Sequence, residues 1–286
     1  MEFEKIGTQQ FFIIIVGIIL FVAIPIAIAL IWKKLKNEPI STILTGAVAF
    51  ILFALILEKP IQNVLIFPTM MGLPEHAASR IINANPYLWA FMVGLFPGIF
   101  EETGRLIAFK TVLKNRKNRE TSISYGIGHG GVEVMVTMIT SQGLITCLLY
   151  AVMINTGAFS TVVEQAKTLA PEQADQLIAF AGQIAAFSFA DLGMMGMERF
   201  FAWLIHVGAS ILVFYACKDK KKLWLYPLAI ILHTLIDGFA GLYMKELVSL
   251  SPWMLEGVIA VCSTLIFCGA YFVLYRNDNA KDYSIS

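Results

Sequence analysis

Long apolar segments are the feature that most constrains how this chain can fold. A helix that crosses a bilayer needs about 20 mostly apolar residues. Apolar residues make up 58% of the chain and charged residues only 14%, which is more apolar and less charged than an average soluble domain. The sequence therefore predicts one integral membrane domain over 1–286, with an all-α fold class: a polytopic transmembrane helical bundle of about seven spans. The predicted spans are 9–32, 40–57, 87–113, 122–154, 192–216, 223–245 and 252–275.

Three stretches leave this count open. The segment 122–154 is long enough to be bent or broken near Ser141–Gly143. Residues 171–190 begin with a proline and contain an apolar run, so they form either an eighth span or an interfacial or re-entrant helix. Residues 61–75 are apolar but short and carry two prolines, which favours an interfacial or re-entrant helix.

The distribution of basic residues predicts the orientation in the membrane. Fourteen lysines and arginines follow the first, third, fifth and seventh spans, and five lie at the opposite ends. Cytoplasmic loops carry the excess of positive charge, so we expect the N-terminus outside and the C-terminus in the cytoplasm of a bacterial-type plasma membrane. The formal net charge of only +1 excludes a strongly basic nucleic-acid binder.

Ionisable residues inside the predicted spans mark a candidate site. A charge near the bilayer centre costs about 2.5–3.5 kcal/mol on insertion scales, yet the core at 87–245 contains a cluster of such residues. The peripheral spans 9–32, 40–57 and 252–275 carry almost none. The candidate catalytic residues are Glu101, Glu102, Arg105, His129, Glu133, His206, His233 and Asp237.

Depth and spacing strengthen this interpretation. At 1.5 Å per residue, most of these side chains lie about 10–21 Å from the predicted cytoplasmic helix ends, in one polar layer. We expect the cavity to open toward that side. Three pairs are spaced i,i+4 and so share a helix face: Glu101 with Arg105, His129 with Glu133, and His233 with Asp237. Each carboxylate of the two histidine pairs is expected to orient its ring.

The backbone around this layer suits close helix packing. Pro97 precedes Glu101 by four residues and is expected to bend its helix. Four glycines, Gly126, Gly128, Gly130 and Gly131, surround His129. Glycines permit neighbouring helices to approach closely in membranes.

Three kinds of chemistry fit histidines and carboxylates in a membrane. The first is hydrolysis of a peptide bond, with a glutamate that deprotonates water and a histidine that moves a second proton. The second is the same reaction with zinc held by His129, His206 and His233. The third is a proton- or metal-coupled transporter. HExxH and GxSxG motifs are absent, as is internal repeat symmetry.

The strings EETGR, YGIGHGGVE, ERFFAWLIH and HTLID resemble the YhfC-type membrane proteins, a family regarded as intramembrane proteases. That family is similar to the CAAX-protease and bacteriocin-processing superfamily (CPBP, or ABI) and to the PrsW type, whose motifs are EExxxR, FxxxH and HxxxN/D. The resemblance covers about residues 87–245. It implies that Glu101 and Glu102 are the paired glutamates, with the first as the water-activating base.

The resemblance also implies roles for the histidines. His129 matches the histidine of FxxxH, with Tyr125 in place of phenylalanine, while His233 and Asp237 match HxxxD, and His206 is an additional histidine. The arginine follows the second glutamate by three residues rather than four, closer to the EExxK spacing of the PrsW type. On a helix this shift makes the first glutamate the better arginine partner.

The expected function is therefore an intramembrane endopeptidase that acts on membrane-embedded or membrane-proximal peptides and proteins. Glu101 activates water with help from His129, and His206 and His233 stabilise the oxyanion or move protons. Asp237 and Glu133 orient the rings, and Arg105 tunes the glutamates. A metal-free glutamate mechanism without a cofactor is favoured, because no two histidines share one helix at ligand spacing. A zinc enzyme and a transporter are the alternatives.

Overall fold

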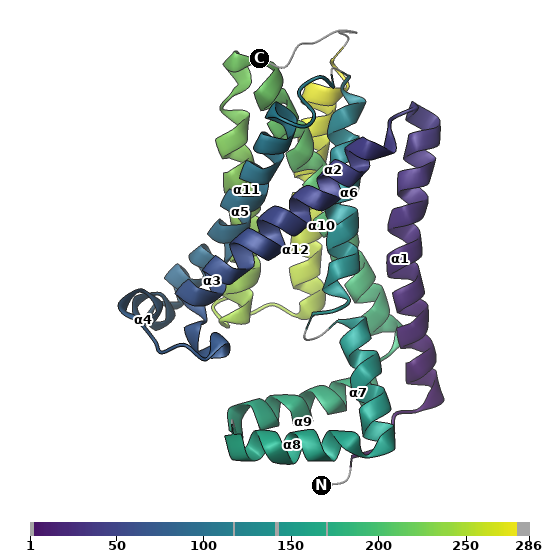
Figure 1. The fold of residues 1–286 in the computed structure, drawn as a ribbon, viewed down its shortest axis with the longest axis vertical. Helices are drawn as coiled ribbons and strands as arrows, with labels where there is room; N and C mark the ends of the chain where they lie inside the picture. Colours follow the sequence, from purple (N-terminus) through teal and green to yellow (C-terminus); the bar gives the residue numbers. More distant parts are fainter. Residues whose placement is uncertain (1–2, 117, 141–142, 170, 279–286) are drawn as a thin grey trace. The chain divides into compact units, whose positions relative to one another are not determined.

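The computed structural model describes residues 3–116, 118–140, 143–169 and 171–278, apart from the side chain of Glu172. All regular elements in this part of the chain are helical, which confirms the all-α prediction (Figure 1). The elements are α1 (Thr8–Lys36), α2 (Ile40–Phe50), the π-helix η1 (Ile51–Glu58), α3 (Lys59–Ile66), the 3₁₀ turn η2 (Pro68–Met71), α4 (Ala77–Ala84), α5 (Pro86–Lys110), α6 (Glu120–Thr137), α7 (Leu144–Thr156), α8 (Ala158–Leu169), α9 (Pro171–Ala186), α10 (Phe189–Lys218), the 3₁₀ turn η3 (Lys220–Lys222), α11 (Leu225–Met244), α12 (Pro252–Ala270) and the π-helix η4 (Tyr271–Tyr275).

The helices that are long and apolar enough to cross a membrane number five among the described residues, or six if α7 and α8, bent by 103°, form one span. The five are Thr8–Lys36, Ile40–Ile66, Phe189–Lys218, Lys220–Met244 and Pro252–Tyr275. The predicted spans 87–113 and 122–154 are missing from this set. Their helices α5 and α6 carry the ionisable residues of the candidate site, which reduce their mean hydropathy. The prediction of seven spans therefore remains a prediction, although the chain is a multi-pass membrane protein.

The predicted break of the fourth segment separates two helices. α6 ends at Thr137 and α7 begins at Leu144. Ser141 and Gln142, where the break was placed, lie outside the described residues, while Gly143 is the N-terminal cap of α7. The segment 171–190 contains the separate helix α9, and 61–75 contains the end of α3 and η2.

The described residues divide into two compact units, 3–26 with 134–197, and 27–133 with 198–278. In the first unit α8 and α9 run side by side (Figure 1). Its core includes Ile13, Leu144 and Phe159, all fully buried. Asn155 fixes the segment before α1, because its side chain accepts from the Ile6 amide at 2.8 Å and donates to the Ile6 carbonyl at 3.0 Å.

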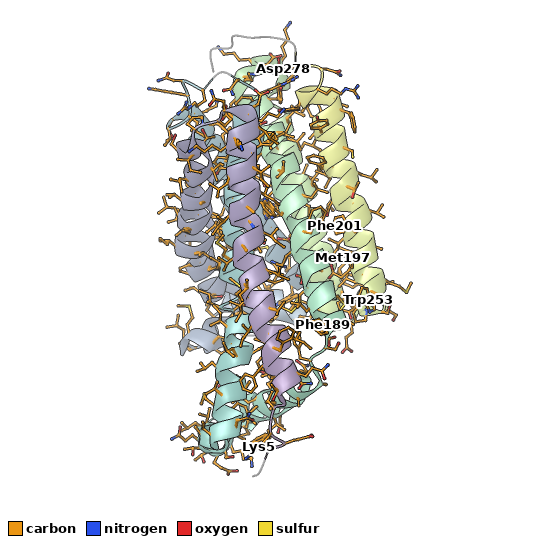
Figure 2. All side chains as sticks on the ribbon, turned by 90° about the vertical axis from the view of Figure 1, so that its right-hand side faces the viewer. Lys5, Phe189, Met197, Phe201, Trp253 and Asp278 are labelled. Carbon is orange, nitrogen blue, oxygen red and sulfur yellow. The ribbon has the colours of Figure 1, made fainter. Side chains whose placement is uncertain are left out.

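The second unit contains all of the candidate site residues. α5 and α11 pack along each other (Figure 1), and glycines allow this contact: a Cβ on Gly94 would meet the backbone of Gly238 at 2.5 Å. Phe109, Tyr125 and Phe214 form an aromatic centre, with Phe109 ring centroids 4.8 and 5.3 Å from the other two. α12, which begins next to Trp253 (labelled in Figure 2), exposes apolar side chains on its outer face, as expected for a helix in contact with lipid.

Close packing of α6 confirms the predicted role of its glycines. A Cβ added to Gly128 would overlap with the Ile43 carbonyl oxygen of α2, and one on Gly126 would lie 2.7 Å from Val207 Cα of α10. Because these neighbouring atoms belong to the backbone, they cannot move aside like a flexible side chain. α6 is thereby held against α2 and α10 at the level of His129.

We expect Gly128→Ala to reduce the free energy of unfolding by about 1–3 kcal/mol, the usual cost of overpacking. The measurement is thermal unfolding of the purified protein in detergent. Gly257→Ala is the matched control, because nothing lies within 4 Å of the added Cβ there. Equal melting temperatures for the two variants would contradict the close approach of α2 and α6.

Candidate functional site

The cluster is built around one turn of α5. Glu101, Glu102 and Arg105 lie in the C-terminal half of this helix and are all buried, with Glu102 and Arg105 completely inaccessible. Buried charges are tolerated only when they are paired and hydrogen-bonded. The partners come from α6, α10 and α11, which the packing of the second unit brings to the same level.

Glu101 lies opposite two histidines from different helices. Its Oε2 is 2.8 Å from His129 Nε2 of α6 and 3.7 Å from His206 Nδ1 of α10. The other nitrogen of His206, Nε2, contacts the Glu133 carboxylate of α6. The two rings lie with centroids 4.9 Å apart. One carboxylate thus contacts two imidazoles, and a second carboxylate fixes the ring of one of them.

Glu102 organises the other half of the cluster. Its Oε1 accepts a hydrogen bond from Arg105 and lies 2.8 Å from His233 Nδ1. On the far side of that ring, His233 Nε2 is 3.5 Å from Asp237 Oδ2. The predicted i,i+4 contact between His233 and Asp237 is therefore present.

Arg105 connects the two halves. Its Nη1 donates to Glu102, its Nε donates to Ser210 Oγ at 3.2 Å, and its Nη2 lies 2.6 Å from His206 Nδ1. Arginine suits this position because its planar fork donates in several fixed directions at once. A lysine could not make these three contacts together.

Two of the predicted pairings are wrong. The expected partner of Arg105 was Glu101, but the structure pairs it with Glu102 at i,i+3. Glu133 was expected to orient His129 on its own helix, but it contacts His206 of α10, and His129 turns to Glu101 of α5. Interhelical partners replace local ones because the glycines of α6 bring the neighbouring helices within side-chain reach.

Access to the cluster differs between its two ends. Residues 121–131 of α6 and 205–218 of α10 are buried throughout, and they lie toward the lysine-rich helix ends. The more accessible members are Glu133 and Asp237, whose side chains are 18% and 38% exposed. The predicted opening toward the lysine-rich, cytoplasmic end is therefore wrong for this conformation, because aromatic side chains such as Phe109 and Phe214 fill that end.

Arg199 extends the polar cluster on the accessible side. Its Nη1 is 3.4 Å from Glu133 Oε1, and its Nη2 contacts Glu198. Neither residue is among the eight candidates predicted from the sequence. The structure places Arg199 against a carboxylate that contacts a site histidine.

Two residues next to the cluster were missed at the sequence level. Glu58 ends the π-helix η1 with its side chain only 1% exposed, accepts from Lys59 Nζ at 3.1 Å, and lies within electrostatic range of Asp237 and His233. Glu58 lies one residue beyond the predicted span 40–57 and was therefore not counted among the ionisable residues inside the spans. Ser210, the partner of Arg105, follows His206 by four residues, and this spacing was the available signal.

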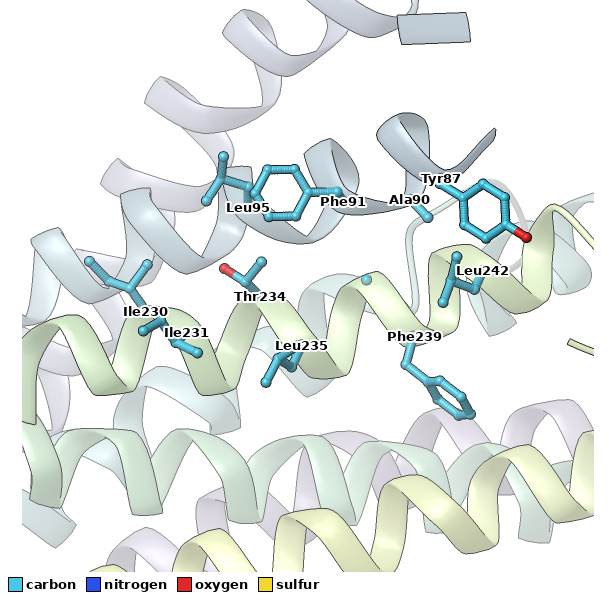
Figure 3. A pocket seen from close by; sticks show the side chains of 11 residues that line it. Tyr87, Ala90, Phe91, Leu95, Ile230, Ile231, Thr234, Leu235, Phe239 and Leu242 are labelled. Atoms are coloured by element: carbon cyan, nitrogen blue, oxygen red, sulfur yellow. The ribbon is translucent and has the colours of Figure 1, made fainter. Parts of the chain in front are cut away.

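An apolar groove of about 520 Å³ runs along α5 and α11 (Figure 3). Its walls include Phe91, Leu95, Leu235 and Phe239. None of the eight candidate residues lines it, although Thr234, which follows His233, does. The groove is therefore suited to an apolar chain and does not contain the groups that could carry out the chemistry.

One group of potential metal ligands stands out among the described residues. One ligand atom each from Glu101, His129 and His206 lies within 4.8 Å of the other two, and all three residues are buried. The alternative metal site predicted from the sequence consisted of three histidines. Glu101 takes the place of His233, which is held between Glu102 and Asp237.

The comparisons with known proteins agree with the resemblance found in the sequence. The family model of the YhfC intramembrane metalloproteases matches residues 20–259. The uncharacterized membrane protein YhfC of Bacillus subtilis (strain 168) is 28% identical over 255 residues, which are 89% of this chain and 92% of that protein. No solved structure matches this chain. The family match covers most of the sequence, and the chain belongs to the YhfC intramembrane metalloprotease family.

Proposed function

We propose that this chain hydrolyses peptide bonds in the membrane at a metal centre held by Glu101, His129 and His206. The observation that carries the proposal is the convergence of one carboxylate and two imidazoles from α5, α6 and α10 at a buried point. Two histidines and one glutamate are a known ligand set of catalytic zinc, which keeps a further position for water or substrate. The name of the family supports the same assignment.

The charge balance of the cluster also supports a bound cation. Among the least exposed members, three carboxylates, Glu101, Glu102 and Glu133, contact two guanidinium groups and the three histidines, so one negative charge is left for a protonated histidine or a bound cation to balance. Uncompensated negative charge is costly where water is excluded. A divalent cation at Glu101 would balance it.

The surrounding residues would prepare the site for hydrolysis. When bound, the metal would polarise the scissile carbonyl and activate a water molecule. Glu133 fixes the His206 ring through Nε2, as carboxylates commonly do for histidine ligands. His233, held between Glu102 and Asp237, would move a proton, and Asp237, whose side chain is 38% exposed, would be the residue that a substrate reaches first.

The sequence favoured a metal-free mechanism because no two histidines share a helix at ligand spacing. That argument fails for a site assembled from three helices. The glycines of α6 permit this assembly, because they bring the backbone of α6 against α10 near His206.

A metal-free glutamate mechanism is the second candidate, and one contact favours it. Arg105 Nη2 lies 2.6 Å from His206 Nδ1, the nitrogen that would bind the metal. In this mechanism Glu101 accepts the proton of water directly and His129, 2.8 Å away, shares it. The two candidates use the same residues and differ in metal content.

Metal content therefore provides the test. We expect the purified full-length protein to contain about one zinc or other transition-metal ion per chain, measured by inductively coupled plasma mass spectrometry. His129→Ala should lower this content at least about tenfold, since one of three ligands is lost. His76→Ala is the matched control, because His76 caps α4 and does not belong to the cluster. Metal-free wild-type protein that cleaves peptides in the presence of a chelator would refute the metal centre and leave the glutamate mechanism.

A further inference from the structure

A second cavity, of about 400 Å³, lies within the second unit at its lysine-rich end. Its walls come from α1, α6, α10 and the C-terminal segment α12–η4. The volume is in the range of about 300–1,000 Å³ that is usual for pockets that hold small ligands. None of the candidate catalytic residues lines it.

The interior of this cavity is aromatic and aliphatic. Trp32 of α1 lies on one wall, and Phe267, Tyr271 and Tyr275 form a stacked row on another, with successive ring centroids 5.6 and 5.1 Å apart. Leu204 of α10 is one of the aliphatic residues of the lining. Such a surface suits a hydrocarbon chain and contributes no group for chemistry.

Two cations, Lys36 and Arg119, also line the cavity. The Lys36 ammonium lies 5.7 Å from the centre of the Trp32 ring, and the Arg119 guanidinium lies 4.8 Å from that of Tyr275. Arg119 is fixed in place, because Nη1 donates to the carbonyls of Tyr275 and Asp278 at 3.0 and 2.9 Å, and Nε donates to Glu120 at 3.3 Å. These contacts leave Nη2 without a partner among the described residues.

We propose that this cavity binds one anionic phospholipid, with its phosphate between Lys36 and Arg119 and one acyl chain along Trp32, Leu204 and Phe267. An apolar interior with cations at one end is complementary to a molecule that is anionic at one end and hydrocarbon at the other. Basic pockets between transmembrane helices on the cytoplasmic side bind acidic lipid head groups, and the predicted orientation places this end in the cytoplasm.

The bound lipid would be part of the framework that holds the catalytic helices. Ile123 and Val207 also line the cavity. Val207 follows His206 directly, and Ile123 lies on α6, the helix of His129. The lipid therefore packs against α6 and α10 together, whatever reaction the site performs.

Lipid retention by the full-length protein tests the site. The protein in detergent is mixed with equal amounts of phosphatidylglycerol and phosphatidylcholine of the same acyl chains, and native mass spectrometry counts the lipids that remain bound. We expect one phosphatidylglycerol, preferred at least about fivefold, and a loss of about fivefold in Lys36→Gln, the contribution of one basic side chain near an anionic head group. Lys33→Gln is the matched control, since Lys33 lies on the same helix end outside the cavity.

Three outcomes would overturn the proposal. Equal retention of the two lipids would exclude recognition of the negative charge. An equal loss of bound phosphatidylglycerol in Lys36→Gln and Lys33→Gln would mean that the lipid is held only by the general positive charge of this surface. Displacement of the lipid by millimolar inorganic phosphate would identify a site for the free anion instead.

A cross-linking experiment locates the acyl chain independently. Phosphatidylglycerol with a photoreactive acyl chain should label Leu204 or Phe267, mapped by peptide mass spectrometry. Val261 and Leu265 are the internal comparison, because they lie on the same helix as Phe267 but are 60% and 66% exposed. Labelling of Val261 and Leu265 alone would overturn the proposal, since it would mean contact with bulk lipid only.

Discussion

Exchange of Glu101 for glutamine is expected to lower the rate of peptide cleavage by roughly 10³-fold. The amide removes the negative charge that either binds the metal or accepts the proton of water. It can still form a hydrogen bond with His129, 2.8 Å away, so the melting temperature should change little. The large effect on activity and the small effect on folding together identify a reacting group.

The measurement is mass spectrometry of a mixture of transmembrane peptides incubated with the purified protein. Glu75→Gln is the matched control, because Glu75 is an exposed glutamate between η2 and α4 and makes none of the cluster contacts described above. Products with the wild type and with Glu75→Gln, but not with Glu101→Gln, are expected. Cleavage by Glu101→Gln at the wild-type rate would contradict the assignment, and intact peptides in every sample would favour the transporter alternative.

The fold class could be predicted from the sequence because the thickness of the bilayer sets the length of apolar segment that a spanning helix needs. The number of spans could not be predicted in the same way. Judged by composition alone, α5 and α6 are not apolar enough to count as spans. Both helices carry ionisable residues of the site. The site needs these polar side chains, whereas the bilayer favours apolar ones. Sequence reasoning is weakest where function changes composition, and α5 and α6 are such segments.

The members of the site were predicted better than their partners. All eight candidate residues belong to one network of contacts, because rare ionisable residues in a membrane cluster together. The spacing along a helix could predict only local contacts, and it found that of His233 with Asp237. It could not predict that Glu133 would contact His206, because that depends on how α6 and α10 are rotated and how closely Gly126 lets them pack.

Replacement of Arg105 by methionine should destabilise the protein by about 3–5 kcal/mol, the largest stability effect among the site residues. Arg105 is fully buried and donates to Glu102 and Ser210 while it contacts His206. Without the guanidinium, the Glu102 carboxylate remains buried next to His233 alone. Removal of one partner of a buried ion pair costs this much because it leaves a charge uncompensated.

The double variant Arg105→Met with Glu102→Gln separates this cause from simple loss of packing. The neutral amide no longer needs a counter-charge, so the double variant should be more stable than Arg105→Met alone, with a coupling energy of about 1–3 kcal/mol. Thermal or chemical unfolding in detergent measures both, and Arg80→Met, at an exposed arginine, should change stability by less than about 0.5 kcal/mol. Additive effects of the two substitutions would mean that Arg105 acts through its contacts with α10, Ser210 and His206, and not as the counter-charge of Glu102.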